Sequence, residues 1–298
     1  MNKTKVVVLG ASGFVGQSFV RSFSLDPSID LSITSRNLST GALFFDILQP
    51  ETWSALLEIK PDIVIDASGY GIVKNQTDLH MLYRVNYLDK RDLIDYLFKY
   101  LPELFWVQIG TAFEYSLENE ALDEDSPCFP RTHYGISKLL FSNYLQMVVK
   151  RQFTILRPFG MFGAGEDISK LFPLLIEAQK SRKEIELSDG LQKRDYFYVN
   201  DLADFVLDLV RHKTIFKLEK EIINVGTGEA RSIRELSQII SEKIEGFDHA
   251  LWNWGAIPQR QGENQIFYNA SVKAKRLGFI STNLDEAFQN TVNYYHNL

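Results

Sequence analysis

The stretch "VVVLGASGFVG", residues 6–16, decides the fold of this chain. An apolar, β-branched run typical of a buried strand leads directly into Gly10, Gly13 and Gly16, which open a helical pattern. The backbone at such a junction turns tightly, approaches a pyrophosphate and packs a helix against the strand, and each task favours a residue without a Cβ atom. The free N–H groups of the first helical turn then bind the phosphates. The stretch predicts a dinucleotide site, with a tight turn that binds no ligand as the alternative.

Strand and helix patterns alternate along the rest of the chain. We expect buried strands at residues 5–10, 31–35, 63–68, 105–110, 153–158 and 221–226, and helices at 13–24, 50–59, 76–100, 133–151, 200–212 and 231–245. This alternation predicts an α/β fold: a Rossmann-type doubly wound parallel sheet with a smaller C-terminal substrate lobe. We expect the dinucleotide-binding domain at 1–160, with returning elements near 195–228, and a mainly substrate-binding lobe at 161–298. The lobe would close over the carboxyl ends of the strands, where open α/β sheets bind ligands.

The composition argues against several classes of protein. Of the 298 residues, 45% are hydrophobic and 23% charged, as in ordinary soluble globular proteins. The net charge of −6, without a basic run, argues against a nucleic-acid partner. No apolar run is long enough for a signal peptide or a membrane helix, and the single cysteine, Cys128, fits a reducing compartment, so we expect a cytoplasmic protein with no membrane partner. The five histidines lack metal-ligand spacing, and no metal site is predicted.

The end of the second predicted strand bears on the choice of dinucleotide. An acidic residue there would bind the ribose hydroxyls of NAD, but the sequence reads "ITSRN", residues 33–37. Arg36 is placed to meet a 2′-phosphate and Ser35 to donate a hydrogen bond to it, which favours NADP(H) and leaves NAD(H) as an alternative. A solvated surface arginine is the other interpretation of Arg36. Asp46 either accepts from the adenine amino group or caps the helix at 50–59.

Two near-identical stretches, "YGISK" (134–138) and "YGIVK" (70–74), each place a lysine four residues after a tyrosine. With 13 tyrosines in the chain, about one such pair is expected by chance. Tyr134 opens a predicted helix, so Lys138 lies on the same face one turn away, where its ammonium would lower the pKa of the phenol and bind a ribose hydroxyl. Tyr70 lies between two glycines, before any helical pattern, and we interpret it as the chance match, in a loop that could line the substrate pocket.

Thr111 follows the strand at 105–110, whose carboxyl end faces the same crevice. A hydroxyl there can hydrogen-bond the reacting carbonyl or alcohol beside the phenol. A helix or turn cap is the alternative for Thr111.

These residues resemble a known family. "GASGFVG", "PDIVIDASG", "RVNYLDKRDLIDYL", "GTAFEY" and "YGISK" stand in the order found in the extended short-chain dehydrogenase/reductases, the NAD-dependent epimerase/dehydratase group, and the likeness runs from about residue 4 to 290. The resemblance implies a catalytic set of Thr111, Tyr134 and Lys138. With the glycine pattern, it implies cofactor contacts at Gly10, Ser12, Gly13, Phe14, Val15, Gly16, Ser35, Arg36, Asp46, Ile47, Ala67, Ser68, Gly69, Asn86, Tyr134, Lys138 and Pro158.

The resemblance also implies a nucleotide-sugar substrate that contacts Thr111, Ala112, Phe113, Arg194 and Arg260. Both arginines match positions that contact the nucleotide diphosphate, and a guanidinium suits a pair of phosphate oxygens. Their alternative is a solvated or ion-paired surface position. The chain departs from the family at Gly160, where an asparagine is common, and at "DASGY", which changes the loop beside the nicotinamide.

Family dehydratases place an Asp-Glu pair after the catalytic hydroxyl residue, but here Ala112 and Phe113 follow Thr111. The stretch "WNWGAIPQR", residues 252–260, resembles nucleotide-deoxyhexulose 4-reductases. We therefore expect NADP(H)-dependent reduction of a 4-keto group on a nucleotide-activated deoxysugar, with Tyr134 as proton donor. The alternatives are an NAD-dependent 4-epimerase, a reductase of a non-sugar carbonyl, and a dinucleotide-binding protein without turnover. The family further implies a homodimer through the helices at 76–100 and 133–151.

Overall fold

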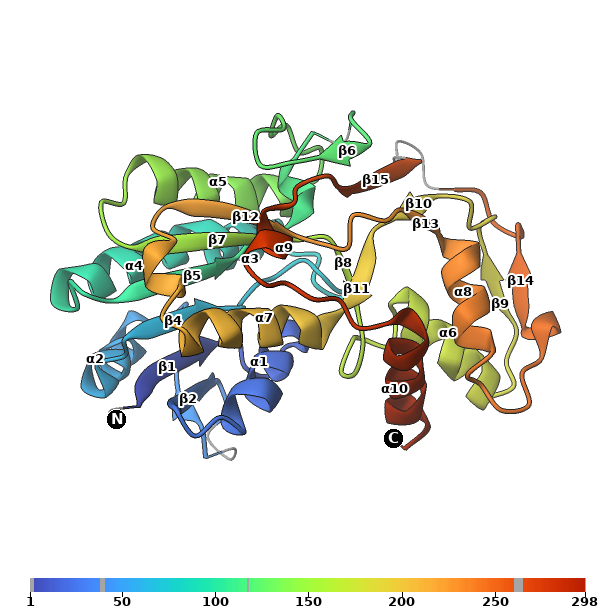
Figure 1. The fold of residues 1–298 in the computed structure, drawn as a ribbon, viewed down its shortest axis with the longest axis horizontal. Helices are drawn as coiled ribbons and strands as arrows, with labels where there is room; N and C mark the ends of the chain where they lie inside the picture. Colours follow the sequence, from blue (N-terminus) through green and yellow to red (C-terminus); the bar gives the residue numbers. More distant parts are fainter. Residues whose placement is uncertain (1–2, 38–40, 117, 260–264, 298) are drawn as a thin grey trace.

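A seven-stranded parallel sheet forms the centre of the larger lobe (Figure 1). The computed structural model describes residues 3–37, 41–116, 118–259 and 265–297. The strand order is β12-β7-β5-β4-β1-β2-β3. The strands are β1 (Thr4–Leu9), β2 (Ile29–Ser35), β3 (Leu43–Phe44), β4 (Ile63–Asp66), β5 (Phe105–Ile109), β7 (Phe153–Pro158) and β12 (Glu221–Val225). The doubly wound fold predicted from the sequence is confirmed, and the order reverses beside β1, which creates a crevice at the strand ends.

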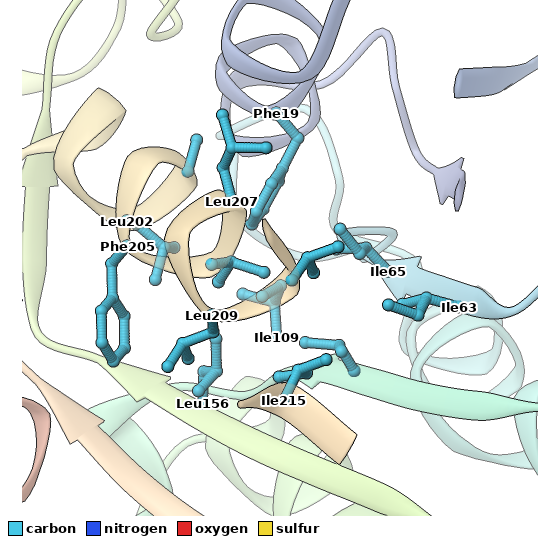
Figure 2. Packing of buried hydrophobic residues seen from close by; sticks show 14 of the residues in the cluster. Phe19, Ile63, Ile65, Ile109, Leu156, Leu202, Phe205, Leu207, Leu209 and Ile215 are labelled. Carbon is cyan, nitrogen blue, oxygen red and sulfur yellow. The ribbon is translucent and has the colours of Figure 1, made fainter. Parts of the chain in front are cut away.

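Helices cover both faces of this sheet. On one face lie α1 (Phe14–Ser24) and α7 (Val199–Arg211), and on the other lie α2 (Ser54–Ile59), α4 (Asp89–Tyr100) and α5 (His133–Met147). Figure 2 shows side chains of α7 and Phe19 of α1 packed against residues of β4, β5 and β7. Alternate residues of β1 from Val6 to Leu9 enter the two cores, which is why this part of the strand is apolar throughout.

The helix predicted at 76–100 is interrupted. It consists of α3 (Leu79–Tyr83), a π-helical turn (Arg84–Leu88) and α4. The wide turn places Asn86 in the interior, and π-helical insertions often occur at functional sites. Short 3₁₀ turns complete the helical elements at Pro50–Thr52, Ala112–Glu114, Ile215–Lys217 and His249–Leu251.

A smaller lobe lies beside the carboxyl ends of the strands (Figure 1). Its core joins α6 (Leu171–Lys180), α8 (Ile233–Ser241), α10 (Leu284–His296) and the paired strands β9 (Ile185–Leu187) and β14 (Trp252–Trp254). Between the lobes run β8 (Gly160–Phe162) with β11 (Tyr196–Tyr198), and a four-stranded sheet of β13 (Arg231–Ser232), β10 (Lys193–Arg194), β15 (Ile266–Asn269) and β6 (Ala121–Leu122). The short helix α9 (Lys273–Arg276) packs on β12.

A buried carboxylate holds the connection between these strands. Asp195 accepts hydrogen bonds from the backbone N–H groups of Thr227 (2.9 Å), Gly228 (2.9 Å) and Asn269 (3.2 Å), and from the Thr227 hydroxyl (2.7 Å). It therefore joins three separate chain segments at one point.

Within the described residues, no helix combines the length and apolar composition that a membrane-spanning segment requires.

The loop between β8 and α6 contains a carboxyl group with a strongly shifted pKa. The Tyr295 hydroxyl on α10 donates to the backbone carbonyl of Glu166 (2.5 Å), while Oε2 of Glu166 is buried with no hydrogen-bond partner among the described residues. Burial raises the pKa of Glu166 to about 8. The folded state therefore binds this proton more tightly than the unfolded state, so its contribution to stability falls as pH rises from about 4.5 to about 8.

We expect Glu166→Gln to raise the thermal midpoint by roughly 3 °C at pH 8 and to leave it unchanged at pH 4.5, because the amide carries no charge to bury. Differential scanning fluorimetry across this range measures the effect. Glu177→Gln on α6, an exposed glutamate, is the matched control. A difference between Glu166→Gln and the parent that is the same at both pH values would contradict the assignment.

Candidate active site

The glycine-rich turn has little space for side chains. Gly10 has a φ of +72°, and a Cβ atom there would lie 2.8 Å from the Ser68 backbone. At Gly16 a Cβ would lie 2.0 Å from the carbonyl oxygen of Gly10, so α1 begins in direct contact with the strand end. Gly13 is the N-cap of α1, and its N–H group donates to Gly10 O (2.9 Å).

The N–H groups that follow the turn are available to a ligand. Those of Phe14, Val15 and Gly16 are in the first turn of α1, where helical N–H groups have no partner within the helix. Ser12 in the turn is exposed. Backbone donors that follow a turn with three glycines, Gly10, Gly13 and Gly16, fit a dinucleotide pyrophosphate.

The turn after β4 lies against the glycine-rich turn. Ala67, Ser68 and Gly69 form it, and a Cβ at Gly69 would lie 3.6 Å from Asn86 Oδ1 and 3.9 Å from Lys138 Nζ. Asn86 accepts from the Tyr70 N–H group (2.9 Å) and donates to Tyr70 O (2.9 Å) and to Ser137 Oγ (3.0 Å). Asn86 therefore fixes this turn to the helix that carries Tyr134.

Tyr134 and Lys138 lie in the first turns of α5, one helical turn apart. Thr132 caps this helix by accepting from the Gly135 N–H group (3.1 Å). Lys138 is buried, and its ammonium donates to the carbonyl of Ile109 at the end of β5 (2.8 Å). Burial lowers the pKa of Lys138 to about 7; Lys90 adds to this effect, and the Asp66 and Glu114 carboxylates oppose it.

The expectation that Lys138 lowers the pKa of Tyr134 is wrong for this arrangement. Burial and the nearby Glu114 carboxylate raise the pKa of Tyr134 well above its usual range, and a hydrogen bond with Thr111 offsets only part of this effect. The lysine ammonium is directed at the Ile109 carbonyl instead. Tyr134 is therefore a protonated phenol at neutral pH.

Tyr70, in the stretch that is nearly identical to residues 134–138, has a different setting. Residues 70–74 are not helical, as predicted, so Tyr70 and Lys74 do not share a helix face. The loop nevertheless reaches the site, because a Cβ at Gly71 would lie 3.8 Å from the ring of Tyr134. The Lys170 ammonium, from the start of α6, donates to the Ile72 carbonyl and so connects this loop with the small lobe.

Thr111 caps the 3₁₀ turn after β5, which was its alternative interpretation. Its Oγ1 accepts from the Phe113 N–H group (3.2 Å), which leaves its own proton free to be donated. Glu114 completes the capping box by accepting from the Thr111 N–H group (3.0 Å). The same hydroxyl also hydrogen-bonds Tyr134, so the two interpretations are compatible.

Glu114 and Arg157 were not predicted as site residues. Both are almost fully buried, and Arg157 Nε donates to Glu114 Oε2 (2.9 Å) while its guanidinium stacks over the Tyr115 ring (4.6 Å). The sequence carries two signals for them: the capping-box spacing from Thr111 to Glu114, and an arginine within an apolar strand. The pair fixes the backbone that presents Thr111.

The remaining predicted cofactor residues lie around the same edge of the sheet. Ser35 ends β2, where its Oγ accepts from the Asn37 N–H group (2.9 Å), and Arg36 is exposed. The carboxylate of Asp46 accepts from the Leu48 N–H group (3.0 Å). Its alternative interpretation as a helix cap is wrong, because Gln49 and Trp53 are the N-caps of the helical segments that follow. Ile47 is buried beneath this turn, and Pro158 ends β7.

The predicted substrate residues lie on the side of the small lobe. Ala112 is buried, whereas Phe113 is 44% exposed and contacts the Phe267 ring edge-on (centroids 5.7 Å apart). Arg194 on β10 is buried, donates to Lys193 O (2.8 Å) and Gln265 O (3.2 Å), and stacks on Phe267. Arg260 lies outside the described residues. In the described part of the chain, no group of three or more His, Cys, Asp or Glu side chains could hold a metal ion.

Comparisons with known proteins agree with the fold. The chain is 26% identical over 300 residues to a GDP-6-deoxy-D-talose 4-dehydrogenase of Aggregatibacter actinomycetemcomitans, which covers 96% of this chain and 97% of that protein. It is 22% identical over 249 residues to a CDP-abequose synthase of Yersinia pseudotuberculosis, covering 80% and 84% of the two chains. The fold matches the crystal structure of a UDP-glucuronic acid 4-epimerase from Bacillus cereus in complex with UDP-glucuronic acid and NAD, with a TM-score of 0.85, 20% identity and 99% coverage of both chains.

The family model matches residues 6–226, which span the glycine-rich turn, Thr111, Tyr134, Lys138 and the last strand of the sheet. This is most of the chain and includes the crevice at the strand ends. The protein belongs to the NAD dependent epimerase/dehydratase family.

Proposed function

We propose that this protein uses NADP(H) to reduce the 4-keto group of a nucleotide-activated deoxysugar. The observation that best supports carbonyl chemistry is the placement of the Tyr134 phenol one helical turn from the buried Lys138 and in hydrogen-bonding reach of Thr111, because a ketone that gains a hydride must also gain a proton. The exposed Arg36 at the end of β2, where an acidic residue would bind the ribose hydroxyls of NAD, favours NADPH and so the reductive direction.

The residues around the carbonyl have separate tasks in this reaction. Tyr134 donates its proton to the carbonyl oxygen, and the Thr111 hydroxyl orients that oxygen by a second hydrogen bond. Lys138 binds the ribose of the dinucleotide at the end of β5. The bound dinucleotide supplies the hydride. The glycine-rich turn and the N–H groups of α1 hold the pyrophosphate, and the small lobe excludes water from the sugar.

Dehydration is not supported by the residues after Thr111. Ala112 and Phe113 offer no carboxyl group. Glu114 is the first carboxylate after Thr111 in the sequence, and it accepts hydrogen bonds from the Thr111 N–H group and from Arg157. The names of the two relatives both refer to nucleotide-linked sugars, and one of them, GDP-6-deoxy-D-talose 4-dehydrogenase, names the proposed redox step in the opposite direction.

The second candidate is an NAD-dependent 4-epimerase. It is favoured by the fold match to a 4-epimerase that holds NAD in its crystal structure. An epimerase oxidises and re-reduces its sugar and so retains its dinucleotide, whereas a reductase exchanges it in every cycle. Mass spectrometry of the nucleotides released from the purified, heat-denatured protein separates the two. Retained NAD would support the epimerase, and an exchangeable site that prefers NADPH would support the reductase, to be followed by NADPH consumption with a panel of 4-keto nucleotide sugars.

The exposed Arg36 at the end of β2 tests the choice of dinucleotide. We expect Arg36→Ala to weaken NADPH binding by about 10- to 100-fold, since a charge-assisted bond to phosphate contributes roughly 1.5–3 kcal/mol, and to leave NADH binding unchanged. Fluorescence titration of both dinucleotides measures this. Arg151→Ala, an exposed arginine just before β7, is the control. Equal losses for NADPH and NADH, or no loss for either, would contradict a 2′-phosphate contact.

A homodimer through α4 and α5 belongs to the same proposal. These helices and their ends expose the apolar side chains Leu88, Leu140, Met147 and Val148. Apolar side chains gathered on neighbouring helices are what an interface between two copies would bury.

A further inference from the structure

An ion pair lies completely buried beneath the crevice. The carboxylate of Asp66, at the end of β4, is 2.6 Å from the ammonium of Lys90 on α4, and both side chains are 0% exposed. Burying two charges is costly unless their other polar atoms also find partners. Here they do: Asp66 Oδ1 accepts from the N–H group (3.0 Å) and hydroxyl of Ser68, and the Lys90 ammonium donates to Ser68 O (3.1 Å).

These bonds converge on one turn of the dinucleotide crevice. Ser68 is held at its N–H group, hydroxyl and carbonyl by the two charged side chains. The same residue packs against Gly10, where a Cβ would be only 2.8 Å away, and Gly69 lies beside Lys138. The ion pair thus determines where the turn 67–69 lies relative to the glycine-rich turn.

The pair also acts on Lys138. The groups that face this ammonium are Asp66 from β4, Lys90 from α4 and Glu114 from the 3₁₀ turn after β5, with Tyr134 on the same helix. Burial works to raise the pKa of Asp66, but Lys90 and Lys138 outweigh it and keep the carboxylate charged. Asp66 therefore stabilises the charged form of Lys138, and Lys90 opposes it.

We infer that Asp66 and Lys90 are positioning residues, which hold the turn 67–69 against the dinucleotide and beside Lys138. The inference rests on the proposed function only in treating Lys138 as the residue that binds the dinucleotide ribose. Neither residue needs to touch the substrate, because both act through Ser68 and Lys138.

The test is the titration of Lys138 itself. In protein labelled with ¹³C at lysine Cε, NMR follows each ammonium with pH, and Lys138→Met identifies the relevant resonance. We expect Lys90→Met to raise the pKa of Lys138 by about one unit or more, because the repelling charge is gone and Asp66 remains. Lys99→Met, an exposed lysine on the same helix, should not move it. An unchanged or lowered pKa of Lys138 in Lys90→Met would overturn the inference.

The double variant Asp66→Asn/Lys90→Met guards against misfolding, since it leaves no uncompensated buried charge. We expect its Lys138 to titrate within about half a unit of the parent. Its NADPH affinity, measured by fluorescence, should fall about tenfold because the turn 67–69 has lost the Lys90 bond to Ser68 O. Parental affinity in the double variant would overturn the positioning role. If the pKa of Lys138 shifts in Lys90→Met but the protein reduces no 4-keto sugar, only the proposed function is contradicted. If the protein is an active reductase but the pKa of Lys138 does not shift, only this inference is contradicted.

Discussion

Tyr134→Phe is expected to lower the rate of carbonyl reduction by about a thousandfold and to leave NADPH binding within about twofold of the parent. The substitution removes the only atom of Tyr134 that carries a transferable proton. The ring, which packs beside Gly71, stays in place, so the crevice keeps its shape. NADPH consumption with a 4-keto nucleotide sugar gives the rate, and NADPH fluorescence gives the affinity.

Tyr144→Phe on the same helix is the matched control, since its hydroxyl donates to Asp95 (2.6 Å), away from the crevice. Its rate should stay close to that of the parent. If Tyr134→Phe kept more than a tenth of the parental rate, another group would have to be the proton donor.

Gly16→Ala should both destabilise the fold and abolish dinucleotide binding. The added Cβ would lie 2.0 Å from Gly10 O, 2.7 Å from Gly10 C and 2.8 Å from Ala11 Cα, and all three are backbone atoms that cannot rotate away. The helix must move off the strand, which costs about 1–3 kcal/mol by analogy with overpacked cores. We expect NADPH affinity to fall at least about a hundredfold, roughly 2.8 kcal/mol. Thermal unfolding and fluorescence titration measure the two effects.

Gly13→Ala separates folding from binding. A Cβ there meets only Gly10 O, at 3.3 Å, so the turn can accommodate it with a small shift. We expect a thermal midpoint close to the parent but weaker NADPH binding, because the methyl group stands where the pyrophosphate approaches. A Gly16→Ala variant as stable as Gly13→Ala would argue against the close packing of α1 on the strand end.

The larger lobe was predictable because its strands carry long local signals. β1, β4, β5 and β7 are mainly apolar runs, and every residue in them except Lys5 is buried, as in strands that are covered on both faces. The strands between the lobes carry no such signal. β10, β13 and β6 are two residues long and pair with segments far away in the sequence, so nothing local distinguishes them from loops.

Within the site, the sequence identified positions but not their electrostatics. The spacing of Tyr134 and Lys138 was enough to place them on one helix face. Their pKa values depend on Glu114, Asp66 and Lys90, which approach from three other elements. No pattern in one sequence shows that these charges meet, which is why the direction of the Tyr134 shift was predicted with the wrong sign.

The path of the chain between the two lobes limits how the protein can be rebuilt. After β7 the chain leaves for the small lobe, returns with α7 and β12, leaves again through α8 and β14, returns with α9 and ends in α10 (Figure 1). A gene fragment encoding residues 1–160 would lack α7, whose apolar side chains cover one face of the sheet. Recombination with another family member therefore cannot exchange the small lobe as a single cassette; a viable chimaera needs matched junctions at every crossing.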